Sequence, residues 1–399
     1  MTNALFLLER AERAQAAGRN ALAERLLQRA GRRAPDDFLR AEIIWRRAEA
    51  LRALGRFREA LSFYWRAHAL YRRCGVSSER LRALLGASAC LRILGRFSQA
   101  GRLWRTVLRQ KYVRRVPDPA PAECLLELAL SERGAGRLLS ARRLLLACLR
   151  QAKRGKDTEL LRHIHWALGG TERFLGHFPK ALASFKRAED LARKTGDAAA
   201  RAYALCGQAG TLRLLGRGAD SYRRYRQAHG VFKRLRDPFG TAYGLCGMGN
   251  ALRTYGNARR SIPLYVRSAE IYARVGDESS RAFALWGQSG AERRLGHPRS
   301  AARLGAQSLE LFLQEKDRRG EIMASLGLAR LLKEQGRTAE ALLYIGKAAQ
   351  TAHRAGLHYE SALARFEKMR LRFPRRDFSS LFRSFGIPAP AVRRWQDLP

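Results

Sequence analysis

A glycine recurs along this chain at an almost constant interval. The spacing is 40 residues, apart from one interval of 41 and a first interval of 37, and the series is Gly18, Gly55, Gly95, Gly136, Gly176, Gly216, Gly256, Gly296 and Gly336. Small residues recur at fixed offsets from it, as Gly249, Ser261 and Ser268 do around Gly256. Small residues let two helices cross closely, and glycine adopts the positive φ at which many helices end. The period therefore predicts a row of helical hairpins.

An aspartate series with the same period marks the boundaries between the hairpins. Its members are Asp157, Asp197, Asp237, Asp277 and Asp317. An aspartate side chain accepts hydrogen bonds from the free amides that open a helix, and Pro238, directly after Asp237, suits the first helical position. We therefore expect each of these aspartates to cap the first helix of a hairpin.

The hairpin pattern resembles the tetratricopeptide repeat. The resemblance covers residues 4–355 and includes the small residues, the closing glycine and a large residue between the helices, namely Tyr64, Trp104, Phe185, Tyr225 and Tyr265. The family repeat of about 34 residues is stretched here to 40, which is similar to the longer repeats of kinesin light chains, rapsyn and LGN-type scaffolds. Two features depart from the family pattern: Gly305 replaces the large residue in the eighth unit, and Gln208, Met248 and Gln288 replace a leucine. The resemblance implies an all-α, right-handed α-α superhelix (solenoid) of about nine units.

The repeat register divides the chain into five segments. We expect three N-terminal units in residues 1–112, a Pro-rich loop at 113–122, six further units in 123–355, a C-terminal capping helix at 356–374 and a tail rich in Arg, Phe and Pro at 375–399. The tail is compatible with a short helix folded back onto the array and with a peptide that binds a partner.

A basic residue ends one stripe of the first helix in eight consecutive units. In the family this stripe faces the concave side of the superhelix, where peptide ligands lie. The predicted ligand-binding residues on it are Arg173, Arg213, Arg253, Arg293, Tyr203, Tyr243, Phe283, Trp286 and Asn250. Guanidinium groups bind carboxylates and phosphates in pairs of hydrogen bonds and stack on rings. The alternative is that these cations only complement the dipole at the end of each helix.

The net charge of the chain is strongly positive. It amounts to +42, because 77 Lys and Arg residues oppose only 35 Asp and Glu residues. Such a surface attracts polyanions. Since only 11 of the 77 are Lys, a GC-rich genome is an alternative source of the arginine excess, although it does not explain the shortage of acidic residues.

Other classes of function find little support in the sequence. No triad, Cys/His pair or pair of carboxylates stands out, so we expect no enzymatic activity and no cofactor. His163 and His165 lack a third metal ligand at suitable spacing, so we expect no metal site. The six cysteines show no CxxC pair, which indicates free thiols in a reducing compartment. Because no signal peptide or membrane-spanning run occurs, we expect a cytoplasmic protein.

Three hypotheses about function follow. The first is a protein-interaction scaffold whose groove binds an extended acidic polypeptide segment. The second is a nucleic-acid-binding protein, with single-stranded RNA on the same basic groove, its phosphates on the arginines and its bases on the aromatic rings. The third is a sensor or dimerisation arm of a larger signalling complex. The sequence does not indicate the oligomeric state.

Overall fold

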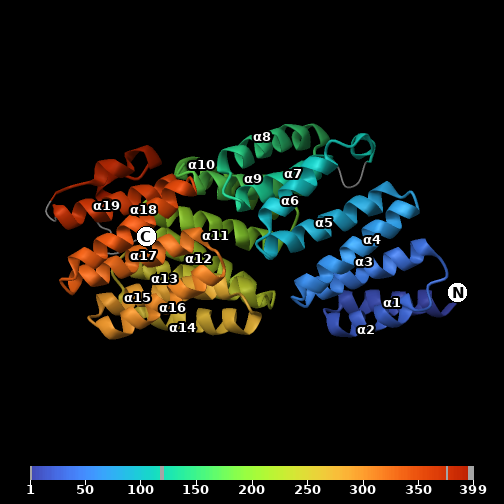
Figure 1. The fold of residues 1–399 in the computed structure, drawn as a ribbon, viewed down its shortest axis with the longest axis horizontal. Coiled ribbons are helices and arrows are strands. Elements are labelled where there is room, and N and C mark those ends of the chain that lie inside the picture. Colours follow the sequence, from blue (N-terminus) through green and yellow to red (C-terminus); the bar gives the residue numbers. More distant parts are fainter. Residues whose placement is uncertain (1, 117–120, 374–375, 394–399) are drawn as a thin grey trace. The chain divides into compact units, whose positions relative to one another are not determined.

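All regular structure in the described residues is helical, and the helices follow one another as hairpins (Figure 1). The computed structural model describes residues 2–116, 121–373 and 376–393. Nine hairpins are followed by one further helix and a short tail, so the predicted all-α solenoid is confirmed. The predicted loop at 113–122 and the predicted tail at 375–399 both include residues outside the described ranges.

The chain divides into two compact units, residues 1–151 and 152–399, which we describe separately. The first unit contains α1 (Thr2–Ala16), α2 (Asn20–Gly31), α3 (Asp37–Ala53), α4 (Phe57–Arg73), α5 (Ser77–Ile93), α6 (Phe97–Val107), the 3-10 helix η1 (Lys111–Arg114), α7 (Pro121–Gly134) and most of α8 (Leu138–Gly155).

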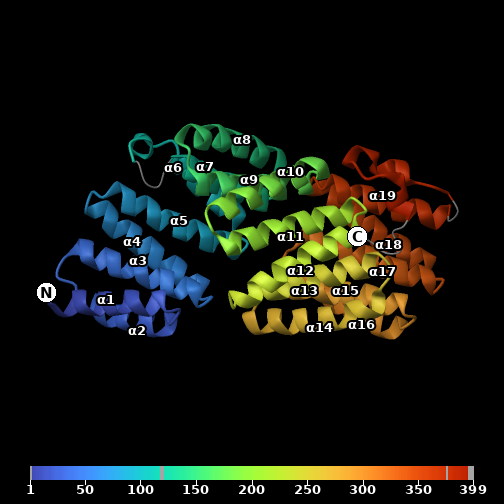
Figure 2. The same ribbon diagram turned by 180° about the vertical axis from the view of Figure 1, so that it is seen from behind.

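The second unit contains five hairpins, a single helix and the tail, coloured green to red in Figure 2. Its elements are α9 (Thr158–Phe174), α10 (Phe178–Lys194), α11 (Ala198–Leu214), α12 (Gly218–Arg234), α13 (Pro238–Thr254), α14 (Ala258–Val275), α15 (Glu278–Arg294), α16 (Pro298–Gln314), α17 (Arg318–Glu334), α18 (Thr338–Arg354), α19 (His358–Arg372), the 3-10 helix η2 (Ser379–Phe385) and α20 (Ala389–Arg393). Each helix packs on the next, and the first helices also pack on each other from α9 through α19.

The turns within the hairpins form as the glycine series predicts. Every glycine of the series has a positive φ, between 70° and 104°. The amide of the residue after the glycine bonds back to the last turn of the helix, as Arg217 does to the carbonyl of Leu212 at 2.9 Å. This is the Schellman arrangement, which satisfies carbonyls that the helix end leaves free.

The boundaries between hairpins are also confirmed. All five aspartates of the series cap the helix that follows: each side chain accepts a hydrogen bond from the amide three residues later, at 2.8 to 2.9 Å. These bonds satisfy amide donors that the first turn of a helix leaves without an intrahelical partner.

A second set of glycines lets neighbouring hairpins interlock. A Cβ atom placed on Gly207 would lie 2.4 Å from the ring of Phe185, and one on Gly247 would lie 2.2 Å from the ring of Tyr225. The large residue of each hairpin therefore packs directly on the backbone of the next first helix. In the eighth hairpin Gly305 replaces the large residue, and the side chain of Leu328 lies 2.9 Å from the position of its missing Cβ. The leucine thus fills that space from the neighbouring hairpin.

The first hairpin of the second unit contacts the last helix of the same unit. The rings of Phe178 on α10 and Tyr359 on α19 lie 5.2 Å apart at their centroids. Arg319 on α17 bonds Glu360 on α19 at 2.7 Å, and its guanidinium lies 5.7 Å from the ring of Phe174 on α9. One circuit of hairpins therefore brings the start of this unit against its end.

The described part of the tail folds back onto this contact. Phe382 lies 5.4 Å from the ring of Phe366 on α19, and Phe385 lies 5.6 Å from the ring of Tyr359. Further along, the side chain of Ala391 would be 2.3 Å from a Cβ on Gly216. The tail is thus an integral part of the core of the second unit.

Three further observations concern the cysteines, the apolar character of the helices and the grouping of possible metal ligands. All six cysteines are free thiols, and all but Cys74 are buried. None of the described helices combines the length and the apolar character needed to cross a bilayer. Within the described ranges, no three His, Cys, Asp or Glu side chains gather closely enough to hold a metal ion.

Candidate functional site

The predicted ligand-binding residues lie on the first helices of four successive hairpins. We use the name arginine row for Arg173 on α9, Arg213 on α11, Arg253 on α13 and Arg293 on α15, each in the last turn of its helix. All four belong to the second unit, and their helices pack on one another in sequence. The row therefore crosses neighbouring repeats of one compact body.

A recurrent contact ties such an arginine to the large residue of its own hairpin. In the first unit Arg52 Nε donates to the Tyr64 hydroxyl at 3.2 Å. In the second unit Arg253 Nε donates to the Tyr265 hydroxyl at 3.1 Å. The tyrosine follows the arginine by 12 residues in both cases. This contact joins the two helices of one hairpin.

Arg253 is buried between two repeats. It is 1% exposed, and its guanidinium lies 4.6 Å from the ring centroid of Trp286. Trp286 in turn donates its indole hydrogen to the carbonyl of Met323 at 2.9 Å. Arg253, Trp286 and Arg293 line a crevice of about 10 Å³, which is room for no more than a single water molecule.

Most of the other predicted residues also make contacts between helices. Asn250 accepts the Tyr265 hydroxyl hydrogen at 2.9 Å. The hydroxyl of Tyr203 donates to the helix-capping Asp237 at 2.9 Å, and Phe283 packs edge-on against Phe312 at 4.6 Å. Arg293 forms an ion pair with Glu334, and its side chain is 11% exposed. The contacts of Asn250 and Phe283 join the two helices of one hairpin, whereas those of Tyr203 and Arg293 join adjacent repeats.

Arg213 lacks the tyrosine hydrogen bond that Arg52 and Arg253 make. Its Nε and Nη1 atoms are buried and have no hydrogen-bond partner, although Tyr225 stands 12 residues later, as Tyr265 does after Arg253. Burial lowers the pKa of the Arg213 guanidinium. The nearby Arg253 also disfavours its charge, and Tyr255 donates its hydroxyl hydrogen to the Arg213 backbone carbonyl at 2.7 Å.

Arg173 approaches the same place from the preceding repeat. Its Nη1 would lie 2.8 Å from a Cβ on Gly210, one helical turn before Arg213, so the absence of that side chain makes room for it. Arg173 acts electrostatically on the hydroxyls of Tyr225 and Tyr243, and Arg213 acts on that of Tyr225. Both guanidinium groups therefore lie near Tyr225.

The balance of charge around these two arginines differs from that of other basic positions on the stripe. Arg52 pairs with Glu49, Arg92 with Glu127 and Arg293 with Glu334. Within the described part of the chain, neither Arg173 nor Arg213 is paired with a carboxylate. The arginine row thus contains two adjacent cations without an anion of the protein beside them.

The sequence reasoning missed the acidic partners of the basic stripe and the tyrosines around its centre. Tyr225 and Tyr255 lie beside Arg213 but were not among the predicted site residues. A signal for Tyr225 was present, because the large residue follows each arginine by a constant 12 positions. No comparable signal marks Glu127 or Glu334, which are 35 and 41 residues from their arginines.

Comparison with known proteins shows the fold. No protein-family model matches the chain, and no curated protein matches its sequence. Among solved structures, a Rap protein in complex with competence and sporulation factor is similar at a TM-score of 0.63 and 13% identity, over 79% of this chain and 90% of the Rap chain. NprR in complex with its cognate peptide NprX is similar at a TM-score of 0.59 and 13% identity, over 76% and 88%. The chain therefore has a TPR-like repeat fold.

Proposed function

We propose that this chain is a non-enzymatic, cytoplasmic scaffold that binds an extended acidic polypeptide segment on the arginine row. We further assign its repeats to the long, 40-residue variety of the tetratricopeptide fold. The observation that carries the proposal is the missing anion beside Arg173 and Arg213.

A ligand carboxylate would supply what these arginines lack. Two of the nitrogens of Arg213 are buried without a hydrogen-bond acceptor, which is a costly state for a charged group. A carboxylate accepts two parallel hydrogen bonds from a guanidinium, and Arg173 and Tyr243 lie close enough to complete its environment. Support also comes from the similar fold of NprR, whose structure holds a peptide.

The proposal is tested by exchanging Arg213 for methionine. We expect Arg213→Met to weaken binding of glutamate-containing and aspartate-containing probe peptides by about 10-fold to 100-fold, the value of one or two charged hydrogen bonds. The same change should leave the melting temperature equal or higher, because it removes an unpaired buried cation. Fluorescence anisotropy with a library of labelled acidic peptides, and with glutamine versions of them, measures the first effect.

A matched control separates this site from general basicity. Arg92→Met removes a guanidinium outside the arginine row that is paired with Glu127, so it should lower stability and leave peptide affinity within about twofold of the parent. Equal loss of affinity in both variants, or binding that ignores the exchange of glutamate for glutamine, would refute the proposal.

RNA binding is the second candidate function. It is favoured by the basic second helices, such as the segment 221–236, where five arginines and one lysine occur. A steep fall of RNA affinity with salt, caused by released counterions, is its signature. If the affinity for single-stranded RNA does not change as the salt concentration rises to moderate ionic strength, phosphate contacts do not drive binding, and this candidate is eliminated.

A further inference from the structure

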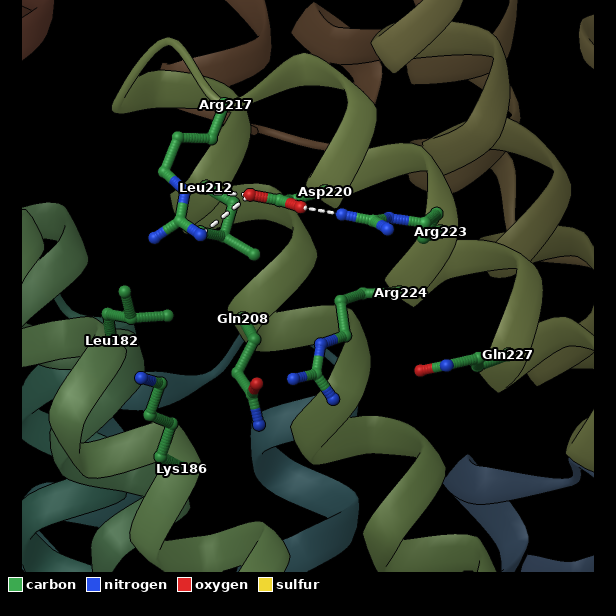
Figure 3. Close-up of a pocket in the computed structure, with 9 residues that line it drawn as sticks. All are labelled: Leu182, Lys186, Gln208, Leu212, Arg217, Asp220, Arg223, Arg224 and Gln227. Carbon is green, nitrogen blue, oxygen red and sulfur yellow. Dashed lines mark hydrogen bonds and ion pairs between the residues drawn. The ribbon is translucent and has the colours of Figure 1, made fainter.

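A cavity of about 280 Å³ lies between the second helices α10 and α12, with α11 as its floor (Figure 3). It belongs wholly to the second unit and shares no residue with the predicted binding site on the arginine row. An inference about it therefore does not depend on the function proposed above. Its lining combines apolar side chains, two amides, one carboxylate and several cations.

A buried hydrogen-bond acceptor without a partner belongs to a residue at the floor of the cavity. Gln208 on α11 stands where the family pattern has leucine, and its side chain is fully buried. Its Nε2 donates to Glu189 Oε2 at 2.8 Å, while its Oε1 has no partner. If the oxygen and nitrogen of the Gln208 amide were exchanged, an oxygen would face the Glu189 carboxylate. The contact with Glu189 therefore fixes which atom of the amide is the oxygen. A ligand with an N–H or O–H donor would satisfy this oxygen.

The rim of the cavity is positively charged. Lys186 on α10 is exposed, and within the described ranges its ammonium has no hydrogen bond or ion pair. Arg224 on α12 has only a loose ion pair with Glu189, at 3.7 Å. Asp220 holds Arg217 at 2.8 Å and also binds Arg223. Asp220 is the one carboxylate on the lining, and the cationic side chains outnumber it, so the lining has a net positive charge.

Apolar side chains lie beside the amide. Figure 3 shows Leu182 on the side of Gln208 that also carries Lys186, Leu212 above Gln208 on the same helix, and Arg224 on the other side. Leucine side chains pack well against the faces of a flat ring, and a guanidinium can stack on one. The cavity can therefore hold a flat group that donates a hydrogen bond, and its cationic rim lies next to that group.

We propose that this cavity binds a nucleotide, either free or as one unit of a single-stranded RNA. The base enters between Leu182 and Leu212 and donates a hydrogen bond from its Watson–Crick edge to Gln208 Oε1. Every base carries such a donor, so the site accepts more than one base. The phosphate binds Lys186 and Arg224, which makes a charge-assisted contact at the rim.

The test is a calorimetric titration of the full chain with AMP, UMP and inorganic phosphate. Lys186→Ala should weaken both nucleotides and inorganic phosphate by about tenfold, the loss of one charged hydrogen bond. Gln208→Leu should weaken the nucleotides by a similar factor and leave inorganic phosphate unchanged. Arg187→Ala is the matched control, because Arg187 is an exposed neighbour of Lys186 on α10 that does not line the cavity. Its nucleotide affinity should stay within about twofold of the parent.

Three results would overturn the proposal. The first is an equal loss of nucleotide affinity in Lys186→Ala and Arg187→Ala. The second is a nucleotide affinity that does not change in Gln208→Leu. The third is a bound nucleotide that an acidic peptide displaces but a second nucleotide does not. Should Gln208→Leu fail to fold by circular dichroism, Leu182→Asp at the wall replaces it, and nucleotide affinity that survives this added anion refutes the site.

An eight-residue RNA identifies the source of the nucleotide. If the RNA binds far more tightly than UMP and loses affinity in Lys186→Ala, the natural occupant is an RNA strand. If the two bind alike, it is a free nucleotide. RNA that binds tightly but equally to the parent and to Lys186→Ala, with no binding of UMP, contradicts the proposal.

Discussion

At the scale of single residues, the second unit buries several polar groups that lack a full set of partners. Besides Arg213, the Nδ1 of His165 on α9 and the Oε1 of Gln208 are buried without a hydrogen bond. Such groups each cost about 1 to 3 kcal/mol. Arg213 and Gln208 belong to the two sites for which we propose ligands. His165 makes the stability of the fold depend on pH.

We expect His165 to lower the stability of the protein in acid. Burial, with help from the nearby cations Arg187 and Lys153, lowers the pKa of His165 from 6.5 to about 4. The unfolded chain therefore binds more protons than the folded one between pH 6.5 and about 4. The stability that depends on a neutral His165 is therefore fully present above pH 6.5. The free energy of unfolding falls as the pH drops from 6.5 to about 4.

The measurement is a series of urea unfolding curves from pH 7 to pH 4. His165→Gln should flatten the fall, because the replacement does not titrate. An unfolding free energy that declines as steeply in His165→Gln as in the parent would show that another group is responsible. Burial also lowers the pKa of His229, so a smaller slope remains in the variant.

At the scale of elements, the fold depends on an aromatic side chain from one hairpin packed on a glycine of the next. A ring on the second helix meets a helix without a side chain at that point, as Tyr225 does at Gly247. The helix loses about 0.5 to 1 kcal/mol at each interior glycine. Burial of the ring, worth about 1.5 to 3 kcal/mol, more than offsets this cost.

Two glycine-to-alanine exchanges should therefore have opposite effects on stability. Gly247→Ala places a methyl group within 2.2 Å of the Tyr225 ring, so we expect the unfolding free energy to fall by about 1 to 3 kcal/mol. Gly346 lies within α18, where a Cβ meets nothing within 4 Å. Gly346→Ala should raise stability by about 0.5 to 1 kcal/mol, since alanine favours the helix.

Denaturant unfolding measures both changes. A neutral Gly247→Ala would mean that the ring moves aside and that the interlock is not tight. A destabilising Gly346→Ala would mean that this surface of α18 is covered in solution.

The difference between local and distant interactions explains which features were predictable. The capping aspartates and the turn glycines were predictable from the sequence, because each acts on atoms three to five residues away. The arginine positions were predictable as a stripe, but the partner of each one was not. Arg52 meets a tyrosine of its own hairpin, whereas Arg293 meets Glu334 two helices further along the chain. Only the packed structure shows that the Arg213 guanidinium has neither a tyrosine hydrogen bond nor a carboxylate partner.

At the scale of the whole molecule, the tail completes the second unit. Phe382 is fully buried, and its ring lies against Tyr359, Phe366 and Phe385. This cluster joins the tail to α19, and Phe385 extends it to Phe178 on the first hairpin of the unit. Phe382 and Phe385 therefore support an interface between Phe178 and Tyr359, which are 181 residues apart in the sequence.

We expect Phe382→Ala to destabilise the second unit by about 3 to 5 kcal/mol, the usual loss for a buried phenylalanine. Hydrogen exchange followed by mass spectrometry should show faster exchange in α10 and α19 together. Arg383→Ala, which changes the exposed neighbouring side chain, is the control and should alter stability by no more than about 0.5 kcal/mol. Faster exchange confined to the tail would show that the tail does not support the interface.

The contact between the start and the end of the second unit also bears on how this protein can evolve. An open row of repeats can gain or lose one hairpin at a time, because each hairpin contacts only its neighbours. Here Phe178 meets Tyr359, and Arg319 reaches both Phe174 and Glu360. An inserted or deleted 40-residue copy would pull these residues out of register with each other. We therefore expect duplication of a single hairpin within residues 152–399 to destabilise this unit, which would keep its number of hairpins constant.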